Sequence, residues 1–227
     1  MNRMASKKAY TGQETAHEGK CAFLAGDYET ALPLFEQDWQ QHQDHLDSLL
    51  HIGYCHSIMG HWRQAAAAYK RLTELAPDHG HAHDLLGTTL CKTGQIEEAA
   101  QALSHAALLR PTDALVRCNL AVSWRQLGRL RKSLSTLREA VKLQPDFAFA
   151  HFELGRTLVE MDDWPAAEAA FKEALNIEPK FARAHLNLGI VYAVRGNWRA
   201  ARQEYEWLQH LDRRLADQLQ DAIEGHR

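Results

Sequence analysis

Histidines, arginines and paired carboxylates are the side chains of this chain that could do chemistry. The 227 residues include 14 histidines, and His79, His81 and His83 alternate within five positions. A metal site needs ligands at i and i+4 on one helix face, or ligands that the fold brings together. His81 faces away from its two neighbours, because residues two apart on a helix do not share a face. We therefore expect no metal site and no cofactor.

The sequence also carries no recognisable catalytic constellation. It contains no glycine-rich phosphate loop, no nucleophile elbow and no HExxH sequence. The carboxylate pairs Glu97–Glu98 and Asp162–Asp163 fall in expected turns or first helical turns, where negative charge favours the helix N-terminus. We therefore expect that the protein is not an enzyme.

Prolines 34 residues apart reveal how the chain is organised. Pro77, Pro111, Pro145 and Pro179 follow one another at this spacing. A fixed period of this length is the mark of a solenoid, in which each repeat buries its apolar face against its neighbours. With proline as position 32, other positions recur in step: position 8 is Gly53, Gly87, Ala121 and Gly155; position 15 is Gly60, Gly94, Gly128 and Asp162; position 24 is Tyr69, Leu103, Leu137 and Phe171.

The pattern resembles the tetratricopeptide repeat (TPR) family. Six repeats are expected, at 12–45, 46–79, 80–113, 114–147, 148–181 and 182–215. The resemblance implies an all-α fold, a right-handed superhelical α-solenoid of antiparallel helix pairs that forms one elongated domain. It says little about function, because one fold hosts many binding tasks.

The residues themselves predict the same helix pairs. Glycine at position 15 tolerates the left-handed conformation that ends the first helix of a repeat, helix A. Proline at position 32 cannot continue the second helix, helix B. The expected helices are 13–25, 28–41, 45–58, 62–75, 79–93, 96–109, 113–126, 130–143, 147–160, 164–177, 181–194 and 198–211. Leucines and an isoleucine four apart predict a capping helix over 212–225, and residues 1–11 are expected to be a disordered tail.

Composition excludes several classes of protein. The net charge is −3 and the pI is about 6.5, which argues against a nucleic-acid partner. No run of apolar residues is long enough for a membrane span, and no signal peptide is recognisable. The four cysteines form no CxxC motif, so a reducing, cytoplasmic location is expected.

The resemblance implies that the A helices line a concave groove. Between residues 114 and 194 the groove positions are apolar with interspersed arginine and asparagine, a composition suited to a protein or peptide ligand. The candidate partner-binding residues are Leu115, Cys118, Asn119, Val122, Arg125, Phe149, Phe152, Arg156, Val159, Arg183, Asn187 and Ile190.

Purely structural roles for these residues remain open. Phe149 and Phe152 would face the groove, or would only pack between A helices. Arg156 would hold a ligand carboxylate, or would pair with Glu153 or Glu160 of its own helix. His83, His151 and His185 share position 4 and are expected to be packing residues that keep one ring nitrogen hydrogen-bonded.

We therefore expect a non-catalytic adaptor that binds a peptide or a helix of a partner protein in the groove. Two alternatives stay open. The chain could assemble with itself into a homo-oligomeric scaffold, or it could hold a client as a chaperone or regulatory subunit of an assembly or secretion system.

Overall fold

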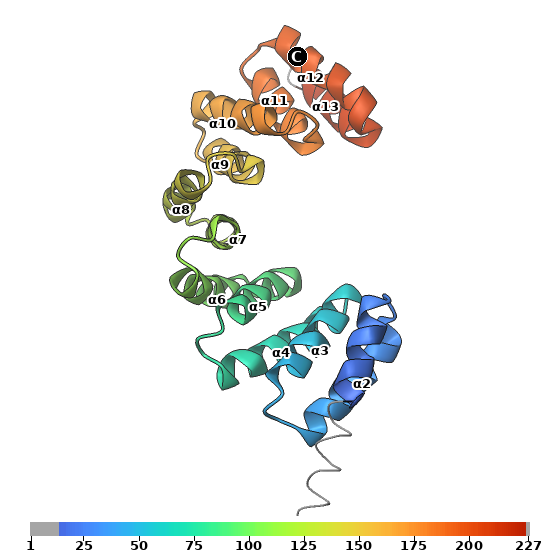
Figure 1. Ribbon diagram of the computed structural model, residues 1–227. Coiled ribbons are helices and arrows are strands. Elements are labelled where there is room, and N and C mark those ends of the chain that lie inside the picture. Colours follow the sequence, from blue (N-terminus) through green and yellow to red (C-terminus); the bar gives the residue numbers. More distant parts are fainter. Residues whose placement is uncertain (1–13, 226–227) are drawn as a thin grey trace, which may run out of the picture. The chain divides into compact units, whose positions relative to one another are not determined.

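The computed structural model describes residues 14–225, and within this range all the regular structure is helical. After helical residues 14–24 come α2 (Tyr28–Gln41), α3 (Leu46–Ile58), α4 (Trp62–Leu75), α5 (Gly80–Thr93), α6 (Ile96–Leu109), α7 (Ala114–Gln126), α8 (Leu130–Leu143), α9 (Ala148–Glu160), α10 (Trp164–Ile177), α11 (Ala182–Val194), α12 (Trp198–Leu211) and α13 (Arg213–Gly225). Successive helices form antiparallel pairs (Figure 1). The expected all-α array is confirmed, and the expected tail over 1–11 lies outside the described residues.

The contacts divide the chain into two compact bodies, where the sequence suggested one elongated domain. The N-terminal body extends to Pro111, and the C-terminal body starts at Thr112. The boundary follows α6 and precedes α7. Each body buries its own apolar clusters, so each is described separately below.

Helix A ends where the residue at position 15 takes a left-handed backbone conformation. Gly60, Gly94 and Gly128 have φ values of 77°, 82° and 69°. Asp162 occupies the same position in the next repeat with a φ of 58°, a conformation that aspartate tolerates better than most residues. The expected role of position 15 is therefore confirmed, including at the one repeat that lacks glycine.

Close approach between the two helices of a repeat depends on the glycine at position 8. A Cβ atom at Gly53 would lie 2.2 Å from the Tyr69 ring, and one at Gly155 would lie 2.5 Å from the Phe171 ring. The side chains at position 24 are fully buried: Tyr69, Leu103, Leu137 and Phe171. The large side chain of helix B thus packs directly on the backbone of helix A.

The C-terminal end of the array is closed by α13. Leu219 of α13 is fully buried, and a Cβ atom at Gly189 of α11 would lie 2.4 Å from its side chain. Tyr205, the residue at position 24 of this repeat, is only partly buried. Asp212 accepts hydrogen bonds from the backbone N–H groups of Arg214 and Leu215 and so caps α13. An additional helix therefore covers the last repeat, as the spacing of its leucines predicted.

Candidate partner-binding surface

All twelve candidate residues lie on three A helices of the C-terminal body. Helix α7 contacts α9, and α9 contacts α11, so these helices form a continuous row. Nine of the twelve residues are exposed or partly exposed, and we call them the A-helix surface: Leu115, Asn119, Val122, Phe149, Arg156, Val159, Arg183, Asn187 and Ile190. Leu115 is the most exposed apolar member, with 48% of its surface accessible.

Phe152 and Cys118 are fully buried, which corrects their expected place in the groove. The Phe152 ring packs 4.8 Å from the Phe181 ring and 6.0 Å from the Phe171 ring, measured between centroids. Phe181 is the last residue of the same repeat and directly precedes α11, so the connection between α10 and α11 covers the face that the sequence assigned to a ligand. Phe149 is only half-buried, and its ring lies 6.5 Å from that of Phe152.

Burial also determines the chemistry of the Cys118 thiol. Desolvation raises the pKa of this group to about 12, and the charges of Glu153 and Asp113 act in the same direction. The neutral thiol is a weak nucleophile and a poor metal ligand. Cys118 is therefore a packing residue.

Arg125 is buried in an ion-pair network and is not available to a ligand. Its guanidinium lies 3.4 Å from the Glu153 carboxylate and 2.5 Å from the Glu160 carboxylate. Glu153, which is also buried, pairs with Arg156 at 3.1 Å. Arg156 thus pairs with Glu153 of its own helix, which is the structural alternative that the sequence left open. Even so, 31% of its side chain remains exposed. The network ties α7 to α9, because buried charges need partners.

Arg183 is the more accessible of the two arginines on the A-helix surface. It is exposed, and its guanidinium lies 4.9 Å from the centroid of the Phe152 ring, a cation–π contact that covers this buried ring. No carboxylate within residues 14–225 forms an ion pair with it. The side-chain amide of Asn187 donates to the Arg183 backbone carbonyl at 2.8 Å.

The histidines at position 4 join successive repeats. The Nε2 atoms of His83, His151 and His185 lie 2.9, 2.9 and 3.0 Å from the carbonyl oxygens of Pro77, Pro145 and Pro179, respectively. Each proline belongs to the preceding repeat and lies six residues before its histidine. The expectation that these rings keep one nitrogen hydrogen-bonded is confirmed, and the bond ties the end of one repeat to the start of the next.

His185 has a second partner that favours its charged form. Its Nδ1 atom lies 2.6 Å from the Glu204 carboxylate. Burial lowers the pKa of His185, but the hydrogen bonds with Glu204 and with the Pro179 carbonyl outweigh it, so the net pKa is above the ordinary value of 6.5. Only the imidazolium can donate from both ring nitrogens at once.

A second candidate surface, on the N-terminal body, was not recognised from the sequence. A hollow of about 550 Å³ lies over α4, α5 and α6, and polar side chains such as Arg63, Lys70, Glu98 and His105 line much of it. Arg63 and Lys70 come from α4, Glu98 and His105 come from α6, and α5 contributes His83 to the lining. The sequence analysis considered only the A-helix positions, so it did not group these residues into one surface.

Comparison with known proteins identifies the class. Two family models, both described as tetratricopeptide repeat, match residues 22–88 and 58–122, and residues 118–175 and 152–213. Together they span most of the chain, so the chain belongs to the tetratricopeptide repeat family. This family mediates protein–protein interactions and is typically non-catalytic. No curated protein matches the sequence.

Solved structures share the fold. PilW, a type IV pilus biogenesis factor, aligns with a TM-score of 0.80 at 18% identity over 94% of this chain and 98% of its own. MamA from Desulfovibrio magneticus RS-1 aligns with a TM-score of 0.71 at 22% identity over 75% of this chain and 96% of its own. Another MamA structure has a TM-score of 0.65 at 23% identity, over 73% and 97% of the two chains. At these identities the likeness is one of fold alone.

The length and composition of the helices also bear on whether the chain could span a membrane. None of those between residues 14 and 225 combines the length and apolar character needed to cross a bilayer.

Proposed function

We propose that this TPR protein is a non-catalytic adaptor that binds a peptide or a helix of a partner protein on its A-helix surface. The observation that carries the proposal is the row of apolar side chains left accessible on three adjacent A helices, with Leu115 at one end and Ile190 at the other. Apolar side chains that the fold leaves uncovered on neighbouring elements commonly mark a partner site.

Charge narrows the chemistry of the partner. Arg183 is exposed without an ion-pair partner in the described chain, and Arg156 is partly exposed beside it. The Arg183 guanidinium suits a carboxylate, which it can bind through two parallel hydrogen bonds, whereas Arg156 already pairs with Glu153. We therefore propose a segment that carries apolar side chains and an acidic group, with Arg183 as the main cation in place of the buried Arg125.

Reducing conditions are part of the same proposal. None of the four cysteines, which all lie within residues 14–225, forms a disulfide, and Cys55 and Cys118 are buried in separate apolar clusters. A chain whose cysteines form no disulfide suits the cytoplasm better than an oxidising compartment.

Affinity capture with a matched control tests the adaptor role. The double substitution Leu115→Glu and Arg183→Glu places two negative charges on the A-helix surface, and should weaken capture of partner proteins by about 10-fold or more. The control is Leu143→Glu with Arg202→Glu, which changes an exposed leucine of α8 and an exposed arginine of α12, both on B helices. Captured proteins are identified and quantified by mass spectrometry, and circular dichroism verifies that each variant is folded.

Equal capture by wild type and the A-helix double variant would contradict the proposal. If the wild-type chain captures only itself, and light scattering shows a mass that rises with concentration, the chain is a self-assembling scaffold instead. Loss of capture by the B-helix control alone would place the partner on the opposite face of the body.

A further inference from the structure

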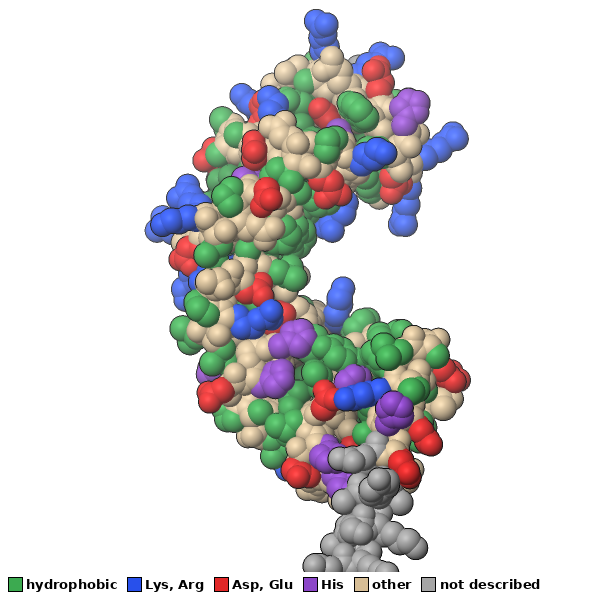
Figure 2. All heavy atoms as spheres, viewed as in Figure 1, with side chains coloured by type: hydrophobic (Ala, Val, Ile, Leu, Met, Phe, Trp, Pro, Cys, Tyr) green, Lys and Arg blue, Asp and Glu red, His purple; other side chains and the backbone are tan. Residues whose placement is uncertain are grey.

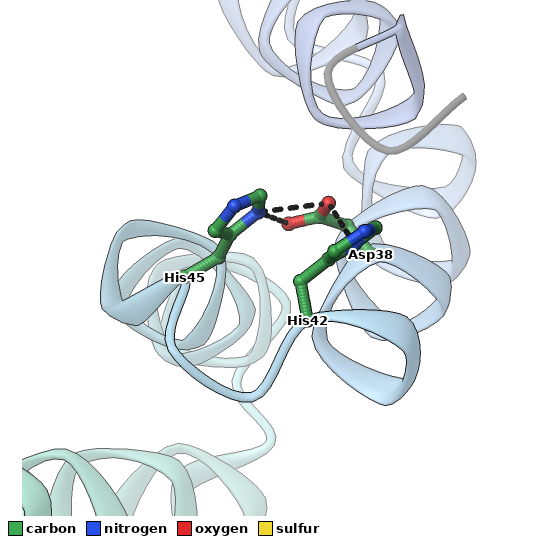
Figure 3. A group of neighbouring side chains, drawn as sticks. All are labelled: Asp38, His42 and His45. Atoms are coloured by element: carbon green, nitrogen blue, oxygen red, sulfur yellow. Dashed lines mark hydrogen bonds and ion pairs between the residues drawn. The ribbon is translucent and has the colours of Figure 1, made fainter. Parts of the chain in front are cut away.

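The connection between α2 and α3 holds a cluster of two imidazoles and one carboxylate, outside the A-helix surface. Figure 3 shows His42 and His45 both pointing toward Asp38. Asp38 lies in the last turn of α2, His42 directly follows that helix, and His45 directly precedes α3. One donor atom from each of the three residues lies within 4.8 Å of the other two.

Asp38 is a buried carboxylate whose partners do not include a lysine or an arginine. Its side chain is fully buried. Within the described chain its side-chain partners are His42, His45 and the Ser48 hydroxyl, which donates to Oδ2. A buried carboxylate needs compensation by positive charge or by hydrogen bonds, otherwise it costs several kcal/mol. The negative charge of Asp38 therefore faces the two imidazoles.

The ring nitrogens are placed as ligands would be. Nδ1 of His45 lies 3.1 Å from both carboxylate oxygens, and Nδ1 of His42 lies 3.4 Å from Oδ1. Ligands 2.0–2.1 Å from a tetrahedral cation are separated by about 3.3 Å, which is close to these two distances. The two rings are stacked, with centroids 4.7 Å apart and an angle of 17° between their planes.

An unsatisfied atom gives independent support. Nδ1 of His42 is buried and has no hydrogen-bond partner, because its approach to Asp38 lacks hydrogen-bond geometry. Buried polar atoms without a partner are rare in folded proteins, and an ion is one of the groups that satisfies them. A cation between the rings and the carboxylate would occupy this nitrogen.

We propose that Asp38, His42 and His45 bind one divalent transition-metal ion, with Zn²⁺ as the representative. Imidazole and carboxylate donors suit zinc and its neighbours, whereas Mg²⁺ and Ca²⁺ prefer sites built wholly from oxygen. The bound form of each imidazole is neutral, with its proton on Nε2 and the lone pair of Nδ1 on the metal. Three protein ligands leave a fourth position for water.

The surroundings favour entry and orientation of the ion. His45 and Ser48 line a surface hollow of about 450 Å³, which gives a path from solvent. The one lysine that lines this hollow, Lys20, pairs with Asp47 at 2.5 Å, so its charge is compensated. The Ser48 hydroxyl donates to Oδ2 of the carboxylate, a role that outer hydrogen-bond partners fill in metal sites.

The proposal is tested by zinc titration of the full-length, tag-free chain, which is first treated with a chelator to remove bound metal. Calorimetry should detect one Zn²⁺ that the variant His42→Ala/His45→Ala does not bind, while Mg²⁺ and Ca²⁺ give no signal. The matched control is His83→Ala/His105→Ala, which removes another stacked imidazole pair of the same body and should retain this Zn²⁺. Ser48→Ala should weaken binding about 10–100-fold.

Co²⁺ gives a spectroscopic signature, because a tetrahedral site with nitrogen ligands produces intense visible absorption that adventitious surface binding does not. Equal Zn²⁺ stoichiometry and affinity in wild type and His42→Ala/His45→Ala would overturn the proposal. Should that variant fail to fold, NMR of the wild-type histidine rings decides the question. Zn²⁺ must shift the ring signals of His42 and His45 first, and shifts confined to other histidines would overturn it.

Discussion

At the scale of single residues, polar side chains in this protein mainly connect helices to one another. The Glu153 carboxylate joins Arg125 of α7 to Arg156 of its own helix, and the position-4 histidines bind the carbonyl groups of repeat prolines. Residue types that suggest ligand binding in the sequence therefore hold the repeats together. Arg183 keeps an exposed guanidinium, and it is the residue that we propose for contact with a partner.

The double contact of His185 predicts a pH-dependent contribution to stability. Because its folded-state pKa lies above the ordinary value of 6.5, protonation favours folding, and the contribution is fully present below pH 6.5. It is lost as the pH rises through the higher folded-state pKa. We expect His185→Gln to cost about 1.5–3 kcal/mol at low pH and less at high pH.

Urea denaturation of both proteins across this pH range measures the difference. The companion variant Glu204→Gln removes the carboxylate that faces Nδ1, so replacing His185 in that background should have a nearly constant effect. A difference between wild type and His185→Gln that grows with rising pH would show that the sign is wrong.

At the scale of helices, the fit between position 8 and position 24 determines how closely each pair packs. An exposed glycine in a helix usually gains stability when replaced by alanine, since alanine is the better helix former. Gly155→Ala should do the opposite and cost about 1–3 kcal/mol, because the added methyl group would overlap the buried Phe171 ring.

Thermal unfolding followed by circular dichroism measures the effect of Gly155→Ala. The matched control is Gly225→Ala, at a helical glycine of α13 with no neighbouring atom within 4 Å of a Cβ, which should change stability by less than about 0.5 kcal/mol. A rise in the thermal unfolding midpoint for Gly155→Ala would mean that α9 and α10 can move apart without loss of stability.

The helices could be predicted closely from the sequence, because the residues that end them act locally. The left-handed residues at position 15 and the repeat prolines mark most boundaries, and α4 and α10 begin and end where the sequence placed them. Exposure at the candidate site was less predictable. Phe152 is buried by Phe181, a ring that directly precedes α11, and this contact exists only when the connection between α10 and α11 packs against α9.

The Asp38, His42 and His45 cluster escaped the sequence analysis for a related reason. Its residues follow an Asp-x3-His-x2-His spacing that crosses the end of α2, the connection and the start of α3. Helical periodicity does not place residues in a connection, so the spacing alone did not show that the three side chains converge.

At the scale of the whole molecule, the two bodies carry different chemistry. Ten of the 14 histidines precede residue 112, and histidine side chains gather on the N-terminal body in Figure 2. The A-helix surface, with its arginines, belongs to the C-terminal body. The proposed metal site and the proposed partner surface therefore involve separate sets of residues, and substitutions in one can be used as controls for the other.

Weakening the packing of α13 on the last repeat should destabilise the C-terminal body and not the N-terminal body. Leu219→Ala empties the contact that α13 makes with Gly189, and should cost about 2–5 kcal/mol. Hydrogen exchange should then show lost protection over residues 182–225 and unchanged protection in the N-terminal body. Leu143→Ala, at an exposed leucine of α8, is the control. Uniform loss of protection along the whole chain would contradict independent closure by α13.

The bond between a proline carbonyl and a histidine six residues later crosses the boundary between repeats, and this has a consequence for building longer proteins. A tandem copy of residues 148–181 would bring His151 of the second copy six residues after Pro179 of the first, which recreates the same bond at the new junction. A designer could thus lengthen the chain in steps of one repeat, because this segment contains both the histidine and the proline carbonyl that form the bond.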